Sequence, residues 1–419
     1  MPMVVEGNEV FKRNMNRKDE GLTEQDYADF RYEVDDVISR FPAIMDPLND
    51  VIGKKYNHVY AVGIGNSLYA PESLKFNFRE NSGVDIDVFE TMEFNAYYVN
   101  YLPENSLVLI CSHGGAAART VDTVYVAKKR GATVISLTCK ETSRLNSSCE
   151  HHLCCTQHNE KAYIWGNNGY ETLALMYALL GVRMGELNGH LTKEQAEKAT
   201  EDIRRAAYIG YETCMKYDDL MVKFGNDAKD QKKIYYLGAG PSYIMAEHGC
   251  AKLMEQCALD GIHQQIEEYG HQQYWVHNRN GNNDFMVMIC PKGVSQKRAK
   301  EDLTEFKFLN LRSVLITTCD ADEEMKKMAD YVIESTEPVS ENLFAFVSSK
   351  VLARMANRLA LAIGNMGERF KSQDQYADHY VTIHYSRFLD EVAEYDIPMP
   401  DTETIESVGP QGLKFDKKN

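Results

Sequence analysis

The sequence lacks any apolar run close to the roughly 18 residues needed to cross a membrane. Its first residues, MPMVVEGNEVFKRN, lack the apolar core of about 7–15 residues that a secretion signal needs. Basic residues are also scarce, since 46 Lys and Arg stand against 62 Asp and Glu and the formal net charge is −16. A nucleic-acid-binding protein carries a basic footprint. We therefore expect a cytoplasmic protein with no nucleic-acid or membrane partner.

Standard metal-binding and disulfide patterns are missing as well. The ten cysteines are scattered, and several end apolar runs, as buried free thiols do in a reducing compartment. The segment CEHHLCC at 149–155 contains cysteine and histidine, but its adjacent pairs would point to opposite faces of a strand. We expect an edge strand there rather than a zinc site, and we expect neither a metal nor a cofactor.

Three segments of the first half recur in the second half, in the same order. The matching pairs are YAVGIGNSLYAPE (60–72) with YYLGAGPSYIMAE (235–247), SLVLICSHGG (106–115) with FMVMICPKGV (285–294), and TVISLTC (133–139) with SVLITTC (313–319). One such pair could arise by chance, but three in order at a nearly constant offset indicate duplication of a whole lobe. The length of 419 residues also exceeds what one core usually serves.

Within each half, short apolar runs alternate with longer amphipathic segments. This alternation predicts βαβ units around buried parallel sheets. We therefore expect an α/β protein with two doubly wound, flavodoxin-like lobes. The expected divisions are an N-terminal helical segment (1–50), a first lobe (51–195), a helical linker (196–230), a second lobe (231–390) and a C-terminal tail (391–419).

Two loops of small residues follow apolar runs of the first half. The first, GIGNS, contains Gly65, Asn66 and Ser67, and the second is the stretch at 111–120, CSHGGAAART. Loops at the carboxyl ends of parallel strands share one edge of the sheet. Backbone N–H groups at a helix start suit an anion there. Each loop alone could be a helix-packing turn, but together they favour an anion pocket.

A carboxylate in the second half is a candidate general base. The expected helix at 246–259 places Glu255 on one face with four apolar residues: Ala251, Met254, Ala258 and Leu259. Burial among them would raise the pKa of a carboxyl group, as a general base requires. A structural glutamate that pairs inside the lobe is an equally weighted alternative.

The duplicated lobe resembles the sugar isomerase (SIS) domain over about residues 50–385. The family pattern has GxxS after the first strand and S-[QH]-S-G-x-T-x-x-T after a later one. The resemblance is strongest to bacterial fructosamine-6-phosphate deglycases, at 104–113, 160–180 and 253–256, with the isomerase part of glucosamine-6-phosphate synthase more distant. It implies a phosphate-binding loop, cofactor-free proton transfer, and a homodimer or higher homo-oligomer with shared active sites.

Carried over by position, the pattern implies a set of residues that bind the anion. Ser67 matches the first-loop serine and Ser112 the first serine of the second loop. The kept second-loop positions are His113, Gly115 and Thr120.

The second loop also departs from the pattern at two positions. Gly114 replaces a serine and Ala117 a threonine, so two hydroxyl donors are missing. Losing both would weaken phosphate binding by roughly 1.5–3 kcal/mol each. Either Arg119 or Arg144 compensates, or the anion is a singly charged sulfonate.

The resemblance also implies the catalytic pair. The family carries a helix glutamate followed sixteen residues later by a histidine, usually within GE-x-x-HGP, and Glu255 and His271 have this spacing. Glu268 matches the acid of that motif, whereas Glu267 replaces its glycine and Gln272-Gln273 its Gly-Pro. Glu255 would move a proton between C1 and C2 of the sugar, and His271 would act on its oxygens.

Two further segments are implied to lie near the substrate. Asn167 and Asn168, in WGNNG, would hold sugar hydroxyls. The segment at 370–388 either closes over the sugar or packs against the lobe; its polar candidates are Lys371, His379, His384 and Arg387.

We therefore expect an aldose–ketose isomerase that acts on a C6-anionic sugar through an enediol. The favoured substrate is a 6-sulfo sugar, sulfoquinovose converted to 6-deoxy-6-sulfofructose, or a 6-phosphosugar. The first alternative is a fructosamine-6-phosphate deglycase that uses the same Glu255 and His271. A non-catalytic sugar-phosphate sensor is a second alternative, but sensors usually carry a DNA-binding helical domain, which the acidic N-terminal segment does not resemble.

Overall fold

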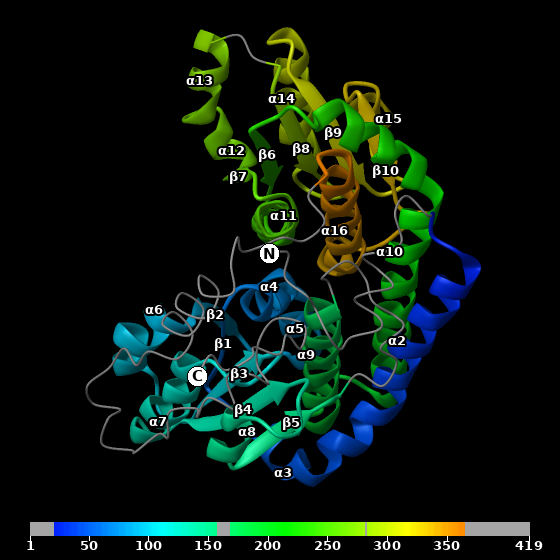
Figure 1. Cartoon of the computed structure of the whole chain (residues 1–419). Helices are drawn as coiled ribbons and strands as arrows, with labels where there is room; N and C mark the ends of the chain where they lie inside the picture. Colours follow the sequence, from blue (N-terminus) through cyan, green and yellow to red (C-terminus); the bar gives the residue numbers. More distant parts are fainter. Residues whose placement is uncertain (1–20, 157–167, 281–282, 365–419) are drawn as a thin grey trace, which may run out of the picture.

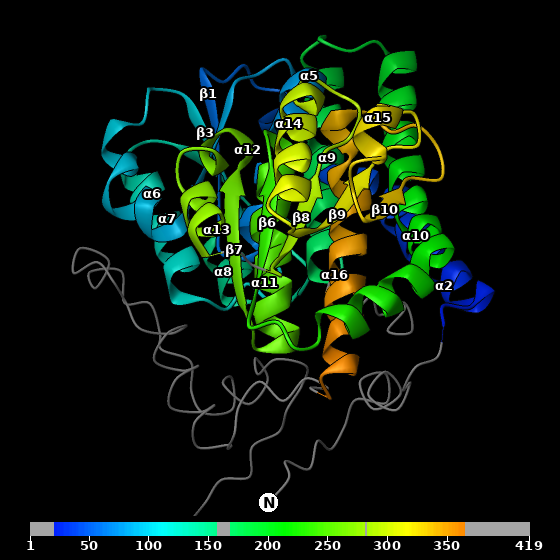
Figure 2. The same ribbon diagram turned by 90° about the horizontal axis from the view of Figure 1, so that it is seen from above.

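A computed structural model describes residues 21–156, 168–280 and 283–364 of the chain. Figure 1 shows two α/β lobes, the first formed by the N-terminal half and the second by the C-terminal half. The long helices α10 (Lys193–Ala228) and α16 (Ala345–Ala362) lie side by side along the lobes, which Figure 2 shows from above.

Both lobes contain a five-stranded parallel sheet of the same topology. The strand order is β2-β1-β3-β4-β5 in the first sheet and β10-β9-β8-β6-β7 in the second, so the second repeats the first when read backwards. The predicted flavodoxin-like order is confirmed twice. The strands are β1 His58–Gly63, β2 Ile86–Glu90, β3 Ser106–Ser112, β4 Thr133–Thr138, β5 His151–Cys154, β6 Lys233–Gly238, β7 Asp260–Gln265, β8 Phe285–Ile289, β9 Arg312–Thr317 and β10 Tyr331–Glu334.

The helices cover both faces of the sheets, in the positions that the amphipathic segments predict. Those of the first lobe and its N-terminal extension are α2 Glu24–Met45, η1 Asp46–Leu48, α3 Asn49–Ile52, α4 Asn66–Ser73, α5 Lys75–Ser82, α6 Thr91–Ala96, η2 Tyr98–Tyr101, α7 Ala118–Lys129, α8 Arg144–Ser148 and α9 Asn168–Leu187. Those of the second lobe are α11 Pro241–Cys257, α12 Ile266–Tyr269, α13 Gln273–Asn280, α14 Gln296–Phe308, α15 Glu323–Lys326 and η3 Glu341–Leu343.

The duplication extends to single backbone torsions. Gly65 has φ 56° and ψ −129°, and its counterpart Gly240 has φ 54° and ψ −127°. A Cβ atom at Gly63 or at Gly238 would clash with the carbonyl oxygen four residues further on. Glycine is therefore required at equivalent points of both strand-to-helix turns.

One hydrophobic core joins the lobes. The largest cluster of buried apolar side chains includes Phe41 of α2, Tyr177 of α9, Ile209 of α10, Leu253 of α11 and Leu359 of α16. No helix in the described ranges is long and apolar enough to cross a membrane.

The cysteines form neither disulfides nor a metal site among the described residues. All ten cysteines are free thiols. The predicted edge strand at 149–155 is confirmed as β5, at one end of the first sheet. In the part of the chain that the structure describes, no group of three His, Cys, Asp or Glu side chains is arranged to hold a metal ion.

Buried ion pairs hold α10 and α9 against α16. Asp218 of α10 accepts hydrogen bonds from Arg354 Nε at 2.7 Å and from Arg358 Nε at 3.0 Å. Lys350 Nζ lies 2.8 Å from Glu171 Oε2 of α9, and both of these side chains are buried. Buried charges of this kind are costly to separate, so these pairs fix how the helices dock.

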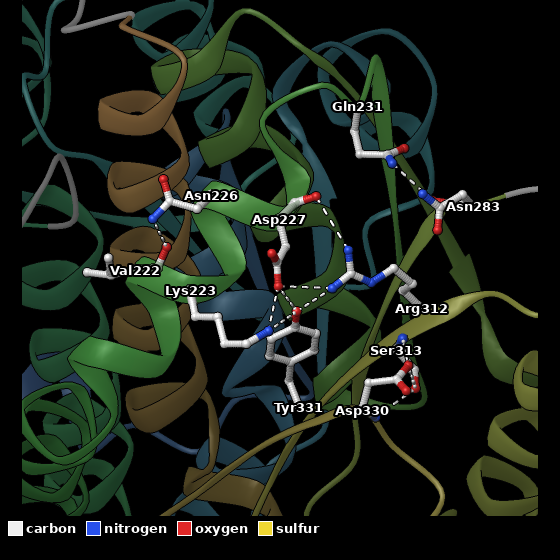
Figure 3. A network of polar contacts seen from close by, with 10 residues as sticks. All are labelled: Val222, Lys223, Asn226, Asp227, Gln231, Asn283, Arg312, Ser313, Asp330 and Tyr331. Carbon is white, nitrogen blue, oxygen red and sulfur yellow. Dashed lines mark hydrogen bonds and ion pairs between the residues drawn. The ribbon is translucent and has the colours of Figure 1, made fainter.

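A second network joins the end of α10 to the second sheet, as Figure 3 shows. The Asp227 carboxylate lies 2.6 Å from Lys223 Nζ and 3.0 Å from Arg312 Nη2, and it accepts a hydrogen bond from the Tyr331 hydroxyl. Hydrogen bonds from Lys223 first, then from Tyr331 and Arg312, hold the pKa of Asp227 well below its usual value. Lys223 and Asp227 thereby fasten α10 to strands β9 and β10.

The lobes also meet where equivalent helices α4 and α11 pack together. Glu72 and Glu247 occupy the same position in the two repeats, and each lies near the other. Burial first, then the charge of Glu247, raises the pKa of Glu72 to about 7, against the opposing effect of Lys75. Burial also raises the pKa of Glu247, and His263, whose Nε2 lies 3.7 Å from Glu247 Oε1, opposes that shift.

We expect this contact to make folding stability depend on pH. Because the pKa of Glu72 is higher in the folded chain, its favourable contribution is complete below about pH 4.5 and is lost as the pH rises through about 7. The free energy of unfolding of the parent should therefore fall by about 1–2 kcal/mol more between pH 5 and pH 8 than that of Glu72→Gln. Urea unfolding of both proteins at the two pH values measures this difference, and parallel pH profiles would contradict it.

Candidate active site

The two predicted anion loops lie beside each other at the carboxyl ends of β1 and β3. The backbone N–H of His113 donates to Ser67 Oγ at 3.2 Å, and that of Gly115 donates to Ser112 Oγ at 3.2 Å. Both serines are buried. The expected adjacency of the loops is confirmed, because β1 and β3 are neighbours in the sheet. Asn66 opens helix α4 directly after Gly65.

A third segment borders the second loop. Gly115 has φ 60°, and a Cβ atom there would lie 2.5 Å from Ser143 Oγ. Leu145 N–H donates to the Gly115 carbonyl at 3.0 Å. Arg144 therefore lies in the chain that runs alongside the loop. On the other side, Asn95 of α6 donates to the Arg119 carbonyl at 3.0 Å and holds the first turn of α7.

The two positions that lack hydroxyls supply no side-chain donor, and Gly114 has open space beside it. A Cβ atom at Gly114 would meet nothing within 4 Å. Ala117 is the N-cap of α7, with φ −62° and ψ 128°, and its side chain makes no capping hydrogen bond. The Thr120 hydroxyl donates to the Ala117 carbonyl at 2.7 Å, so its proton is used within the loop. The loop thus has space, but few side-chain donors, for an anion.

His113 adds no positive charge to this loop. Burial first, then the nearby Lys140, lowers its pKa to about 4, so the imidazole is neutral at pH 7. Its carbonyl accepts from Cys139 N–H at 3.0 Å, and its ring packs on Gly169 of α9, where a Cβ atom would lie 3.1 Å away. The imidazole of His113 is therefore a neutral group within the loop.

The first turn of α9 connects this loop with helix α11 of the second lobe. Gly169 packs against His113, and the next residue, Tyr170, has its ring 4.8 Å from the ring of His248 on α11. His248 is buried and lies one turn before Lys252. The side chain of the helix-initial Asn168 and all of Asn167 lie outside the described residues. So do Lys371, His379, His384 and Arg387.

The expected surroundings of Glu255 are wrong. Helix α11 ends at Cys257, and Ala258 has φ 53°, so helical spacing does not continue to Leu259. Met254 is 50% exposed, because the core stripe of α11 runs through Leu253 and Cys257 instead.

Glu255 is paired with a lysine, as the equally weighted alternative of a glutamate that pairs inside the lobe predicted. Its Oε2 lies 2.6 Å from Lys252 Nζ; the lysine side chain is fully buried and the glutamate side chain is 26% exposed. An ammonium group at that distance stabilises the carboxylate, which is the form a general base needs. Sequence reasoning missed Lys252, although a lysine three residues before a glutamate on a helix is the signal that could have found it.

His271 lies on the surface of the second lobe, in the turn between α12 and α13. Its side chain is 66% exposed, and Nε2 is 3.4 Å from Glu267 Oε1. Glu268 Oε2 accepts from Gln272 Nε2 at 2.8 Å. Figure 1 shows α12 in the upper lobe and α7 in the lower one, on opposite sides of α11. A single chain therefore does not bring His271 to the loop that contains Ser112.

In the equivalent loop of the second lobe, a carboxylate occupies the space beside Gly293. A Cβ atom at Gly293 would clash with the Glu341 carboxylate, which accepts a hydrogen bond from the backbone of Val294. Burial raises the pKa of Glu341 against that hydrogen bond. An internal carboxylate thus lies where the first lobe has open space, which leaves the first lobe as the candidate anion site.

Known proteins of similar sequence contain the same lobes. The SIS domain family matches residues 54–182 and 229–363. The glutamine–fructose-6-phosphate aminotransferase (isomerizing) of Thermotoga maritima is 23% identical over 308 residues, which are 73% of this chain and 49% of that protein. Fructosamine deglycase FrlB of Bacillus subtilis is 27% identical over 201 residues, 48% of this chain and 58% of that protein. The chain spans about half the length of the curated relatives it matches.

Solved structures share the fold. The C-terminal domain of glucosamine-fructose-6-phosphate aminotransferase from Francisella tularensis superposes with a TM-score of 0.67 at 18% identity, covering 83% of this chain and 98% of that one. Tagatose-6-phosphate ketose/aldose isomerase from Escherichia coli gives a TM-score of 0.63 at 12% identity, covering 87% and 96%. Because the family match covers both lobes, the chain belongs to the SIS domain family.

Proposed function

We propose that this chain is an enzyme, an aldose–ketose isomerase that acts on a sugar with an anionic group at C6. The observation that carries the proposal is the ion pair of Lys252 with Glu255 on α11. Helix α11 and the anion loop both pack against the first turn of α9. The similarity to an isomerizing aminotransferase and to a ketose/aldose isomerase supports the same reaction class.

The chemistry requires only proton transfers. The Glu255 carboxylate removes the C2 proton of the open-chain aldose, and the electron pair of that C–H bond forms the C1–C2 double bond while O1 gains a proton. The resulting enediol loses the O2 proton, and Glu255 returns its proton to C1, which leaves a ketone at C2. His271 carries the protons of the ring oxygen, O1 and O2.

Because of the position of His271, the proposal includes an oligomer in which two copies of the chain share an active site. Because α12 and α7 lie in different lobes, the imidazole that serves the loop of one chain comes from a neighbouring copy. The exposed fraction of 66% of the His271 side chain leaves it available to such a copy. The proposed enzyme is therefore at least a homodimer with shared active sites.

The proposed anion is a sulfonate, and the proposed substrate is sulfoquinovose, which would give 6-deoxy-6-sulfofructose. Gly114 and Ala117 offer no hydroxyl, and His113 is neutral at pH 7. A phosphate monoester carries about −1.5 to −2 charge and needs more neutralisation than the single charge of a sulfonate. Steady-state kinetics with sulfoquinovose and glucose 6-phosphate test this choice, and a clear preference for glucose 6-phosphate would reject it.

Restoring the missing hydroxyls should reverse the preference. Gly114→Ser has open space for its side chain, and Ala117→Thr places a hydroxyl at the N-cap of α7. Each added donor to a phosphate is worth roughly 1.5–3 kcal/mol, so kcat/KM for glucose 6-phosphate should rise about tenfold or more relative to sulfoquinovose. The ratio between the two sugars is its own control, since a general loss of activity lowers both values. An unchanged ratio in the double variant would show that these positions do not select the anion.

A fructosamine-6-phosphate deglycase is the second candidate, favoured by the similarity to FrlB. It would use the same Glu255 and His271 but would release an amine from the substrate. Incubation with fructosamine 6-phosphate made from lysine, followed by an assay for free lysine, separates the two reactions. Lysine release faster than isomerisation of either sugar would favour the deglycase.

A further inference from the structure

A chain of charged groups leads from helix α14 to His271. Arg298 Nε of α14 lies 3.0 Å from Glu267 Oε2, and Glu267 Oε1 lies 3.4 Å from His271 Nε2. The three side chains come from two separate elements, α14 and the α12 segment. Glu267 thus contacts the arginine with one oxygen and the imidazole with the other.

Arg298 is itself held in place from several sides. Its Nη1 lies 3.2 Å from Glu301, and its Nε lies 3.8 Å from Asp302, whose side chain is only 5% exposed. A Cβ atom at Gly270 would lie 2.9 Å from Arg298 Nη2, so the guanidinium lies against the turn that precedes His271. Burial raises the pKa of Asp302 to about 7, and Arg298 opposes that shift. The arginine therefore lies against the backbone of this turn and forms an ion pair with the carboxylate of Glu267.

Packing does not orient the imidazole, because the side chains of His271 and Glu267 are 66% and 65% exposed. A histidine that transfers protons needs its ring turned correctly and its proton on a defined nitrogen. A carboxylate that accepts a hydrogen bond from one ring nitrogen orients the ring and keeps the proton on that nitrogen. The other nitrogen is then left for the substrate. Here that role would leave Nδ1 of His271 for the sugar.

We propose that Glu267 and Arg298 are positioning residues for His271: Glu267 orients the imidazole, and Arg298 holds Glu267. This inference rests on the proposed function, in which His271 transfers protons. The exposed Glu267–His271 pair contributes little to stability. The inference therefore predicts that Glu267→Ala loses turnover without a loss of folding.

The test compares Glu267→Ala, Glu267→Gln and Arg298→Met with the parent, using sulfoquinovose and glucose 6-phosphate as substrates. We expect kcat to fall about 10–100-fold in Glu267→Ala and Arg298→Met, with KM within about twofold. The melting temperature of Glu267→Ala should stay within about 2 °C of the parent. Glu267→Gln keeps an oxygen that can accept from the imidazole, so it should recover part of the loss. The control is Glu324→Gln, which breaks the exposed ion pair with Lys327, touches neither Arg298 nor Glu267, and should keep the parent kcat.

His271→Ala, measured alongside, separates this inference from the proposed function. An inactive His271→Ala together with fully active Glu267→Ala and Arg298→Met would overturn the positioning role alone. A loss of kcat that Glu324→Gln shares, or a loss in Glu267→Ala that is accompanied by a lowered melting temperature, would also overturn it. Full turnover in His271→Ala, or no turnover of either sugar by the parent, would overturn the proposed function and the inference with it.

Discussion

Glu255→Gln is expected to lower kcat by about 10²–10⁴-fold, the usual contribution of a general base. Glutamine keeps the shape of the side chain and an oxygen for Lys252, but it cannot accept the C2 proton. Sugar binding should stay within about threefold of the parent, because the anion loop lies in the other lobe. Steady-state kinetics give the loss of kcat, and calorimetric titration with sulfoquinovose gives the binding.

The matched control is Glu324→Gln. Glu324 lies 2.8 Å from Lys327 in an exposed pair of the same spacing along its helix, so the substitution should leave kcat unchanged. Unchanged turnover in Glu255→Gln would exclude the base role. If subunits share their sites, mixing inactive Glu255→Gln with inactive His271→Ala should restore up to about a quarter of the parent activity, because half of the dimers are mixed and one of their two sites is intact. No recovery after subunit exchange would reject the shared site.

Asp218→Asn is expected to lower the free energy of unfolding by about 3–5 kcal/mol. The substitution removes the carboxylate that receives Arg354 and Arg358, and all three side chains are at least 90% buried. Each guanidinium would then lose its buried counter-charge, which costs far more than the loss of a surface pair. Urea unfolding followed by circular dichroism measures the change.

The control for this loss is Lys193→Met on the same helix α10. Lys193 and Glu197 are 3.8 Å apart with side chains 77% and 67% exposed, so this substitution should cost less than about 1 kcal/mol. Equal losses in the two variants would contradict the special cost of the buried cluster. A loss of unfolding free energy in Asp218→Asn below the expected range would mean that water reaches the two arginines.

Much of the fold could be predicted because its signals are local and occur twice. Alternating apolar and amphipathic segments indicate parallel strands and covering helices wherever they stand in the chain. The glycines of the two strand-to-helix turns follow from backbone geometry, since Gly65 and Gly240 need a positive φ. The absence of hydroxyl groups at Gly114 and Ala117 follows directly from the residue types.

The surroundings of Glu255 could not be predicted in the same way. The expected apolar face contained Met254, but the buried face of α11 depends on where α16 and the second sheet pack. That packing turns Lys252 inward and leaves Met254 half exposed. The sequence left a desolvated carboxylate and a glutamate that pairs inside the lobe equally weighted, and a Lys–Glu pair is the result.

The sequence by itself thus determined two repeated α/β lobes and a loop after β3 that is poor in hydroxyls, because these depend on residues close together in the chain. Only the tertiary structure decided that Lys252 partners Glu255, that Glu341 fills the second loop, and that His271 faces solvent beside Glu267. Such contacts depend on which helix faces meet and which turns approach each other. They join side chains that local patterns leave independent.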